Sequence, residues 1–188
     1  MSMYTANEIH LIKRPSGLPS HSDVDRVQVE LQHPASGQIL LKNLYMSVDP
    51  YMRGRMRENA VYAQAYQLNK PMYGGAIGKV IESNSDQVKA GDIVLNQGAW
   101  RDGLVADDTS VTVLQPFDND SLSLYLGALG MPGLTAYVGL QKFGEPKAGE
   151  TVFVSAASGA VGAIVCQIAK QLRCRVIGSA VSYTHLRA

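Results

Sequence analysis

The chain has little of what a metal centre, a disulfide scaffold or a membrane protein needs. It contains only two cysteines and four histidines among 188 residues. Cys166 falls inside an expected helix and Cys174 just after it, so the sequence offers no disulfide framework. No run approaches the roughly 18 apolar residues of a membrane span, and no basic and then apolar leader opens the chain. We therefore expect a soluble protein of a reducing, cytoplasmic compartment.

Charge is also sparse. Charged residues make up 18% of the chain and the formal net charge is +1, which creates no long-range field. Neither a nucleic acid nor an anionic membrane is therefore expected as a partner. The hydrophobic share of 46% is ample for a core, and the length fits one domain, or a small domain and part of another.

The first 120 residues favour β-structure. Val27, Val29 and Leu31 alternate with polar neighbours, as in a half-buried strand. Residues 38–48 are long enough for a strand that bends or changes face, and further strands are expected at 76–83, 92–95 and 110–114. Glycine, aspartate and asparagine separate them. Many short strands at this spacing predict a small barrel or sandwich.

Beyond residue 120 the pattern becomes helical and then alternating. Helical spacing covers residues 121–126 and 132–142, followed by a strand from Thr151, a helix over 160–172 and a second strand over 175–180. The turn before the last helix contains Ala157, Gly159 and Gly162 at the spacing of a dinucleotide-binding fingerprint, with alanine replacing the first glycine. Gly159 would admit a pyrophosphate to the helix N-terminus, and Gly162 would allow close helix packing. A turn that serves packing alone is the alternative.

The last eight residues, 181–188, do not continue this pattern, because a turn and another helix would follow the second strand. They resemble translated cloning-linker sequence, and we expect native sequence to end near Ala180. A natural short C-terminus is the alternative. A unit that stops after two strands leaves a hydrophobic edge open, so the chain alone is expected to be poorly stable and inactive.

Three blocks in order resemble one family. They are NLYMSVDPYMRGRM at residues 43–56, GMPGLTAYVG at 130–139 and ETVFVSAASGAVG at 150–162. Together they are similar to the zinc-independent branch of the medium-chain dehydrogenase/reductase superfamily, in the group of leukotriene B4 12-hydroxydehydrogenase, prostaglandin reductase and bacterial curcumin reductase. The resemblance covers residues 5 to about 180.

The resemblance implies an α/β plus β fold. A GroES-like β-barrel domain would cover residues 1–125, and the truncated start of a Rossmann doubly wound domain would cover 126–180, with the active site between them. It also implies NADPH-dependent reduction of the carbon–carbon double bond of enones and enals, by a homodimer at full length. Two alternatives remain. One is a quinone oxidoreductase, which is not expected to carry the block at 49–53; the other is a non-catalytic GroES-like binding module.

By the same resemblance, Met131 and Thr135 would contact the nicotinamide side of NADP(H), and Tyr51 would line the substrate pocket and hydrogen-bond the carbonyl. The pyrophosphate would face the helix start, formed by Gly159, Ala160, Val161, Gly162 and Ala163. The structural alternatives are a core position for Met131 and a helix N-terminal hydroxyl for Thr135. For the block around Tyr51 they are a packed ring and a local ion pair between Asp49 and Arg53. The catalytic residues are expected beyond residue 180.

No metal is expected. The positions where zinc-dependent relatives hold their metal would correspond to residues 47–49 and 73–75, which contain neither cysteine nor histidine. Residues 178–180 carry no acidic side chain for the ribose hydroxyls of NAD, which permits the NADP that the resemblance implies. His10, His21 and His33 lie beside polar or turn residues, and we expect no catalytic role for them.

Overall fold

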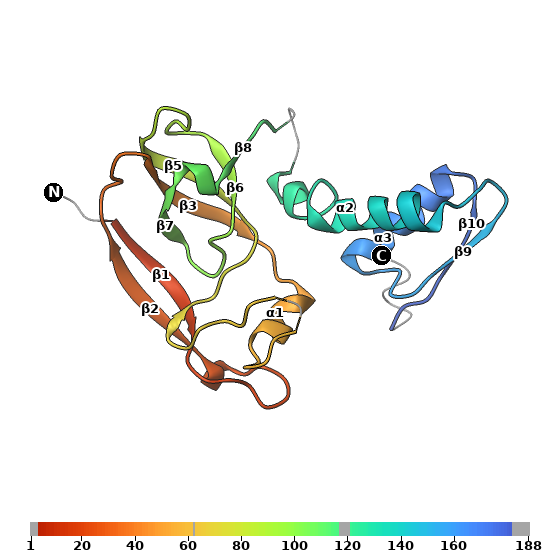
Figure 1. Ribbon diagram of the computed structural model, residues 1–188, viewed down its shortest axis with the longest axis horizontal. Helices are drawn as coiled ribbons and strands as arrows, with labels where there is room; N and C mark the ends of the chain where they lie inside the picture. Colours follow the sequence, from red (N-terminus) through yellow and green to blue (C-terminus); the bar gives the residue numbers. More distant parts are fainter. Residues whose placement is uncertain (1–3, 62, 117–120, 182–188) are drawn as a thin grey trace. The chain divides into compact units, whose positions relative to one another are not determined.

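The structure, a computed structural model, describes residues 4–61, 63–116 and 121–181. Contacts within the chain divide it into two compact units, Met1–Leu122 and Ser123–Ala188 (Figure 1). Each unit is described by itself. The domain limits expected from the sequence, at residues 125 and 126, stay a prediction, and residues 182–188 of the expected non-native tail lie outside the described part.

A five-stranded antiparallel sheet, in the order β7-β3-β5-β6-β8, forms the centre of the first unit (Figure 1). Its strands are β3 (Gln38–Met46), β5 (Ala76–Asn84), β6 (Ile93–Asn96), β7 (Gly103–Asp107) and β8 (Thr112–Leu114). Ile39 and Leu41 of β3 pack with Val80, Val88 and Val94 in a buried core. The strand expected to bend has two register shifts against β5.

A second, three-stranded antiparallel sheet has the order β2-β1-β4. It consists of β1 (Tyr4–Leu11), β2 (Val24–Leu31) and β4 (Lys70–Pro71). Short 3-10 helices occur at His21–Asp23 and Asp108–Ser110. The sequence pattern predicted most of β2 but did not predict β1, β4 or β7. The β-rich character expected of this part of the chain is confirmed.

A short helix, α1 (Pro50–Arg55), follows β3 directly and was also not predicted. It starts after Asp49, with Pro50 in the first turn, where the missing N–H has no intrahelical acceptor to lose. Met52 and Met56 anchor α1 in a second core with Leu11, Tyr66 and Met72, which lie on β1 and on the chain around β4. This anchor fixes the direction of the side chains that α1 carries.

A 3-10 helix, Leu122–Leu126, lies across the boundary between the two units. The second unit continues with α2 (Met131–Val138), β9 (Thr151–Val154), α3 (Ala160–Gln171) and β10 (Arg175–Gly178). The strands β9 and β10 are parallel neighbours, and α2 packs against α3. The helix expected over 132–142 is α2 followed by a π-helical segment, Gly139–Gly144. It ends where Glu145 adopts a left-handed conformation, with φ 42°.

The apolar side chains of the second unit are only partly enclosed. Leu140, Ala169 and Cys174 form its buried centre, with partly buried neighbours from β9, α3 and β10. By contrast, Phe153 on β9 and Ile177 on β10, which are partners in the strand register, are 65% and 41% exposed. None of the helices in the described part of the chain has the length and apolar character needed to cross a bilayer.

Candidate nucleotide and substrate site

Among the described residues, no acceptor is bonded to the first backbone N–H groups of α3, which follow the turn after β9. Gly159 is the residue before α3 and is extended, with φ −74° and ψ 166°. Its N–H donates to the carbonyl of Ala156 at 2.9 Å, and its carbonyl accepts the N–H of Ala163 at 2.9 Å. Residues of a first helical turn have no intrahelical acceptor for their N–H groups. The donors that remain are the amides of Ala160, Val161 and Gly162, at the end of the helix that favours an anion.

The glycines in and near this turn are explained in two different ways. A Cβ on Gly162 would lie 2.3 Å from the carbonyl oxygen of Ala156, and a Cβ on Gly178 would lie 2.7 Å from the Cβ of Ala157. These glycines are therefore required by packing. A Cβ on Gly159 would meet a single atom, the Ala156 oxygen, at 3.1 Å, and Gly159 is exposed. Packing alone thus explains Gly162 but gives a weaker reason for Gly159.

The two residues expected beside the nicotinamide lie one turn apart on α2. The hydroxyl of Thr135 donates to the carbonyl of Met131 at 2.8 Å and lies 3.6 Å from its sulfur. Met131 is 53% exposed, which argues against the core position considered as its alternative. Gly130 and Gly133 allow this start of α2, because a Cβ on either would lie within 2.3 Å of a backbone oxygen.

Tyr51 lies in the first unit, on the first turn of α1, and is half-buried against the core of that helix. Its hydroxyl lies beside Gly74, where an added Cβ would come within 3.2 Å of the oxygen. Burial raises the pKa of Tyr51, and the carboxylate of Asp49 raises it further, while Arg55 lowers it. At neutral pH the phenol is therefore protonated and can donate a hydrogen bond. Tyr51 and Arg55 line a cavity of about 300 Å³ together with small and apolar residues of 50–63.

The other arginine of α1 has a structural role. Arg53 donates from Nε and Nη2 to the carbonyl of Gly17, and from Nη2 to that of Pro15 at 3.2 Å. The suggested ion pair between Asp49 and Arg53 is wrong, since no ion pair in the described residues joins them. The helix is instead fastened to the loop before β2, because an extended arginine reaches backbone acceptors there.

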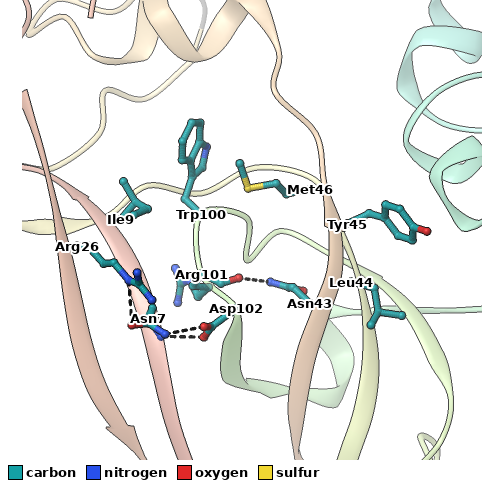
Figure 2. Close-up of a pocket in the computed structure, with 10 residues that line it drawn as sticks. All are labelled: Asn7, Ile9, Arg26, Asn43, Leu44, Tyr45, Met46, Trp100, Arg101 and Asp102. Atoms are coloured by element: carbon teal, nitrogen blue, oxygen red, sulfur yellow. Dashed lines mark hydrogen bonds between the residues drawn. The ribbon is translucent and has the colours of Figure 1, made fainter. Parts of the chain in front are cut away.

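A cavity of about 450 Å³ in the first unit lies between β1, the end of β3 and residues 100–102 (Figure 2). Asn7 donates twice to the carboxylate of Asp102, at 2.7 Å each, and accepts from Arg26 Nε at 3.1 Å. Asn43 donates to the carbonyl of Arg101 at 2.9 Å. No sequence pattern predicted this cavity, and Tyr51 is not among the residues that line it.

The structure gives no grouping of metal ligands in the residues it describes: no three side chains of histidine, cysteine, aspartate or glutamate gather there. Two of the histidines lie within hydrogen-bond distance of a glutamate. His10 Nε2 lies 2.7 Å from Glu8, and His33 Nδ1 lies 2.9 Å from Glu82.

Comparison with known proteins places the chain in a family. Residues 7–114, more than half of the chain, match the family described as the N-terminal domain of oxidoreductase. The chain is 44% identical to an NADP-dependent 2-alkenal reductase of Nicotiana tabacum over 172 residues, 89% of this chain and 50% of the relative. It is 43% identical to the NADPH-dependent curcumin reductase of Escherichia coli over 171 residues, 90% and 49% of the two chains. The chain belongs to the zinc-independent medium-chain dehydrogenase/reductase group.

The fold agrees with this membership. The crystal structure of CurA from Vibrio vulnificus in complex with NADPH superimposes with a TM-score of 0.88 at 39% identity, covering 95% of this chain and 52% of that one. Structural neighbours in the medium-chain dehydrogenase/reductase group combine a GroES-like and a Rossmann architecture. The chain spans about half the length of these relatives. Arg55 and Gly74, which lie beside Tyr51 in the first unit, had not been singled out in the sequence, and neither had Gly178, which packs against Ala157 in the second unit.

Proposed function

We propose that this chain is the N-terminal part of an NADPH-dependent reductase that acts on the carbon–carbon double bond of α,β-unsaturated ketones and aldehydes. The observation that carries the proposal is the N-terminus of α3. There the N–H groups of Ala160, Val161 and Gly162 have no acceptor within the described part of the chain, and Gly159 before them is exposed. Such a helix start suits a pyrophosphate. The names of the relatives, an alkenal reductase and a curcumin reductase, support the substrate class.

The residues present fit the cofactor at two places. The three amides would bind the pyrophosphate, and Met131 with Thr135 on the exposed surface of α2 would contact the nicotinamide. Gly178 at the end of β10 and the two residues after it contain no carboxylate that would oppose the 2′-phosphate of NADP. NADPH, when bound, supplies the hydride for the β-carbon of the enone.

The substrate oxygen gains negative charge as the β-carbon accepts hydride, and a fixed donor aimed at that oxygen stabilises the resulting enolate. We assign this donor role to the Tyr51 hydroxyl. Its raised pKa keeps the proton on the phenol at neutral pH, so Tyr51 polarises the carbonyl and stays protonated. The group that protonates the α-carbon is expected beyond residue 180. A homodimer of the full-length protein stays a prediction of the resemblance.

The test joins residues 1–180 to the C-terminal half of the Escherichia coli curcumin reductase, which is 43% identical in the matching half. Once a cooperative thermal transition shows that this chimera folds, NADPH oxidation is followed with an enone, an enal and a quinone. We expect turnover of the enone and enal, and none by the 188-residue chain alone. A folded chimera that turns over the quinone but no enone would favour the quinone oxidoreductase alternative.

Tyr51 is tested in the same chimera. Tyr51→Phe removes one hydroxyl and keeps the ring in the α1 core. We expect enone turnover to fall at least about tenfold, because the developing oxyanion loses a hydrogen-bond donor. The affinity for NADPH should stay unchanged. The matched control is Tyr45→Phe, which removes a hydroxyl from a ring that is 45% exposed on β3. Equal turnover by Tyr51→Phe and the unaltered chimera would leave Tyr51 as a packed aromatic residue.

A further inference from the structure

Arg55 is a buried cation surrounded by tyrosine rings. The residue is 7% exposed, and its guanidinium carbon lies 4.0 Å from the ring centre of Tyr73, 4.4 Å from that of Tyr66 and 6.0 Å from that of Tyr51. Its Nε donates to the carbonyl of Gln64 at 2.9 Å. No carboxylate forms an ion pair with Arg55 within residues 4–61, 63–116 and 121–181. The charge is therefore balanced by ring faces and a carbonyl oxygen.

Burial of the Arg55 guanidinium lowers the stability of the fold if packing is its only role. A guanidinium taken out of water loses its hydration, which a carboxylate normally offsets. Cation–π contacts with ring faces offset part of this loss. The neighbouring core positions of α1 are Met52 and Met56, so an unbranched apolar side chain already fills this environment twice. A positive charge at position 55 therefore calls for a reason besides volume.

The rings of Tyr66 and Tyr73 hold the guanidinium of Arg55 in a fixed place. Tyr66 donates its N–H to the carbonyl of Arg55 at 2.7 Å and its hydroxyl to the carbonyl of Tyr73 at 2.8 Å. The Tyr66 and Tyr73 rings meet edge to face, with centres 5.4 Å apart and planes at 78°. Gly74, next to Tyr73, leaves room for the Tyr51 hydroxyl. The cation and the phenol are thus both located by the same short segment, residues 66–74.

We propose that Arg55 is a positioning residue that holds the Tyr51 ring and polarises its hydroxyl toward the substrate oxygen, a role that rests on the proposed function of Tyr51. A fixed positive charge beside a phenol makes the O–H a stronger donor, because it stabilises the negative charge left on the oxygen. The other groups facing Tyr51 act in the opposite direction: Asp49 and Tyr73 raise its pKa, as burial does. Arg55 lowers the pKa of Tyr51 and so opposes burial, Asp49 and Tyr73.

The first measurement needs no substrate. In the 188-residue chain labelled with ¹³Cζ-tyrosine, the Tyr51 signal is assigned with Tyr51→Phe and titrated with base. We expect Arg55→Met to weaken the Tyr51 phenol as an acid about tenfold, because the cation lies a few ångströms from the ring. Arg55→Lys should restore it to within about threefold. Arg57→Met, an exposed arginine two residues along, is the matched control and should leave the titration unchanged. An unchanged Tyr51 titration in folded Arg55→Met overturns the proposal.

A second measurement covers the case that Arg55→Met does not fold. Interaction between two groups is reciprocal, so ionisation of Tyr51 must shift the ¹³Cζ signal of Arg55 in the unaltered chain. We expect a shift with the midpoint of Tyr51 that is lost in Tyr51→Phe. Its absence in the unaltered chain overturns the proposal.

In the chimera, Arg55→Met should lower kcat for the enone several-fold and leave NADPH affinity unchanged, whereas Arg57→Met changes neither. Full kcat in Arg55→Met would overturn the proposed role. An inactive chimera in which ionisation of Tyr51 still shifts the Arg55 ¹³Cζ signal would instead count against the proposed function, because that shift is measured without substrate.

Discussion

The two glycines at the start of α3 lead to opposite expectations when each is replaced by alanine. Gly162 faces the turn and Gly159 faces solvent, so Gly162→Ala should damage the fold and Gly159→Ala should damage nucleotide binding. The fingerprint spacing alone assigns both glycines to one motif. The separation of their roles comes from what an added methyl group would touch.

The cost of Gly162→Ala is worked from two opposing effects. The new Cβ would lie 2.3 Å from the carbonyl oxygen of Ala156 and 3.0 Å from its carbonyl carbon, so backbone must move. Overpacking of this kind costs about 1–3 kcal/mol, and contact with backbone favours the upper end. Alanine is favoured over glycine inside a helix by about 1 kcal/mol. The net loss of unfolding free energy is therefore about 2 kcal/mol.

The assay is urea unfolding followed by circular dichroism at 222 nm, because α2 and α3 dominate the helical signal. Gly139→Ala is the matched control: the new Cβ would meet nothing within 4 Å, and the residue is helical, with φ −58°. It should stabilise by up to about 1 kcal/mol. The reasoning is refuted if Gly162→Ala is no less stable than Gly159→Ala.

The binding half of the prediction is measured in the chimera with the Escherichia coli reductase half. Gly159→Ala places a methyl group where a pyrophosphate would approach the free amides of α3, while its own contact, 3.1 Å to a single oxygen, requires only a small adjustment. We expect NADPH affinity to fall at least tenfold with the thermal transition little changed. Unaltered affinity would favour the turn that serves packing alone.

Three further substitutions test local claims. Ala156→Gly should stabilise the chain by about 0.5–1 kcal/mol in urea unfolding, because Ala156 has φ +48° and glycine adopts this conformation without the Cβ strain; a loss of stability would contradict it. Tyr66→Phe should cost about 1–2 kcal/mol, since the buried hydroxyl bonds the Tyr73 carbonyl at 2.8 Å and its loss leaves that acceptor unpaired; Tyr45→Phe at an exposed ring should cost nothing. The pKa of Asp23 is lowered by hydrogen bonds from the backbone and hydroxyl of Ser20, so its stabilising effect is present above about pH 4 and lost as pH falls through the lowered folded value. Asp23→Asn should therefore show a smaller loss of urea midpoint between pH 7 and pH 3 than the unaltered chain, and an equal loss would refute the role of Asp23.

The second unit could be predicted from sequence more closely than the first. The strand at Thr151, the helix over 160–172 and the strand over 175–180 correspond to β9, α3 and β10 with ends that differ by at most two residues. Apolar runs of a parallel pair and the helical period between them are local signals, and tiny residues mark the turn. The π-helical end of α2 had no such signal, because its residues continue the helical spacing.

The hydrophobic pattern of β1, in the first unit, does not indicate a strand. The buried residues of β1 are Ala6, Glu8 and Leu11. One of them is charged, and Leu11 lies on the opposite face of the strand from the other two, so no apolar alternation is visible in the sequence. Glu8 is 9% exposed and is paired with His10 at 2.7 Å and Arg101 at 3.7 Å. Arg101 lies more than ninety residues along the chain, so the partner that makes this burial possible is visible only after folding. β7 was missed for a related reason: a strand of five residues pairs with β3 across a long separation.

The same limit applies to the candidate site. Tyr51 could be selected from the block it belongs to, because the resemblance carries a role with it. Arg55 lies in the same block and could have been an exposed helical arginine, since α1 is short and four arginines occur between residues 53 and 101. What makes it unusual is its burial against Tyr66 and Tyr73, which come from a different segment and shield it from water. A charged side chain becomes informative when the fold buries it without a carboxylate partner among the described residues. That burial depends on α1 and on the segment of residues 66–74 together, and no single stretch of sequence contains both.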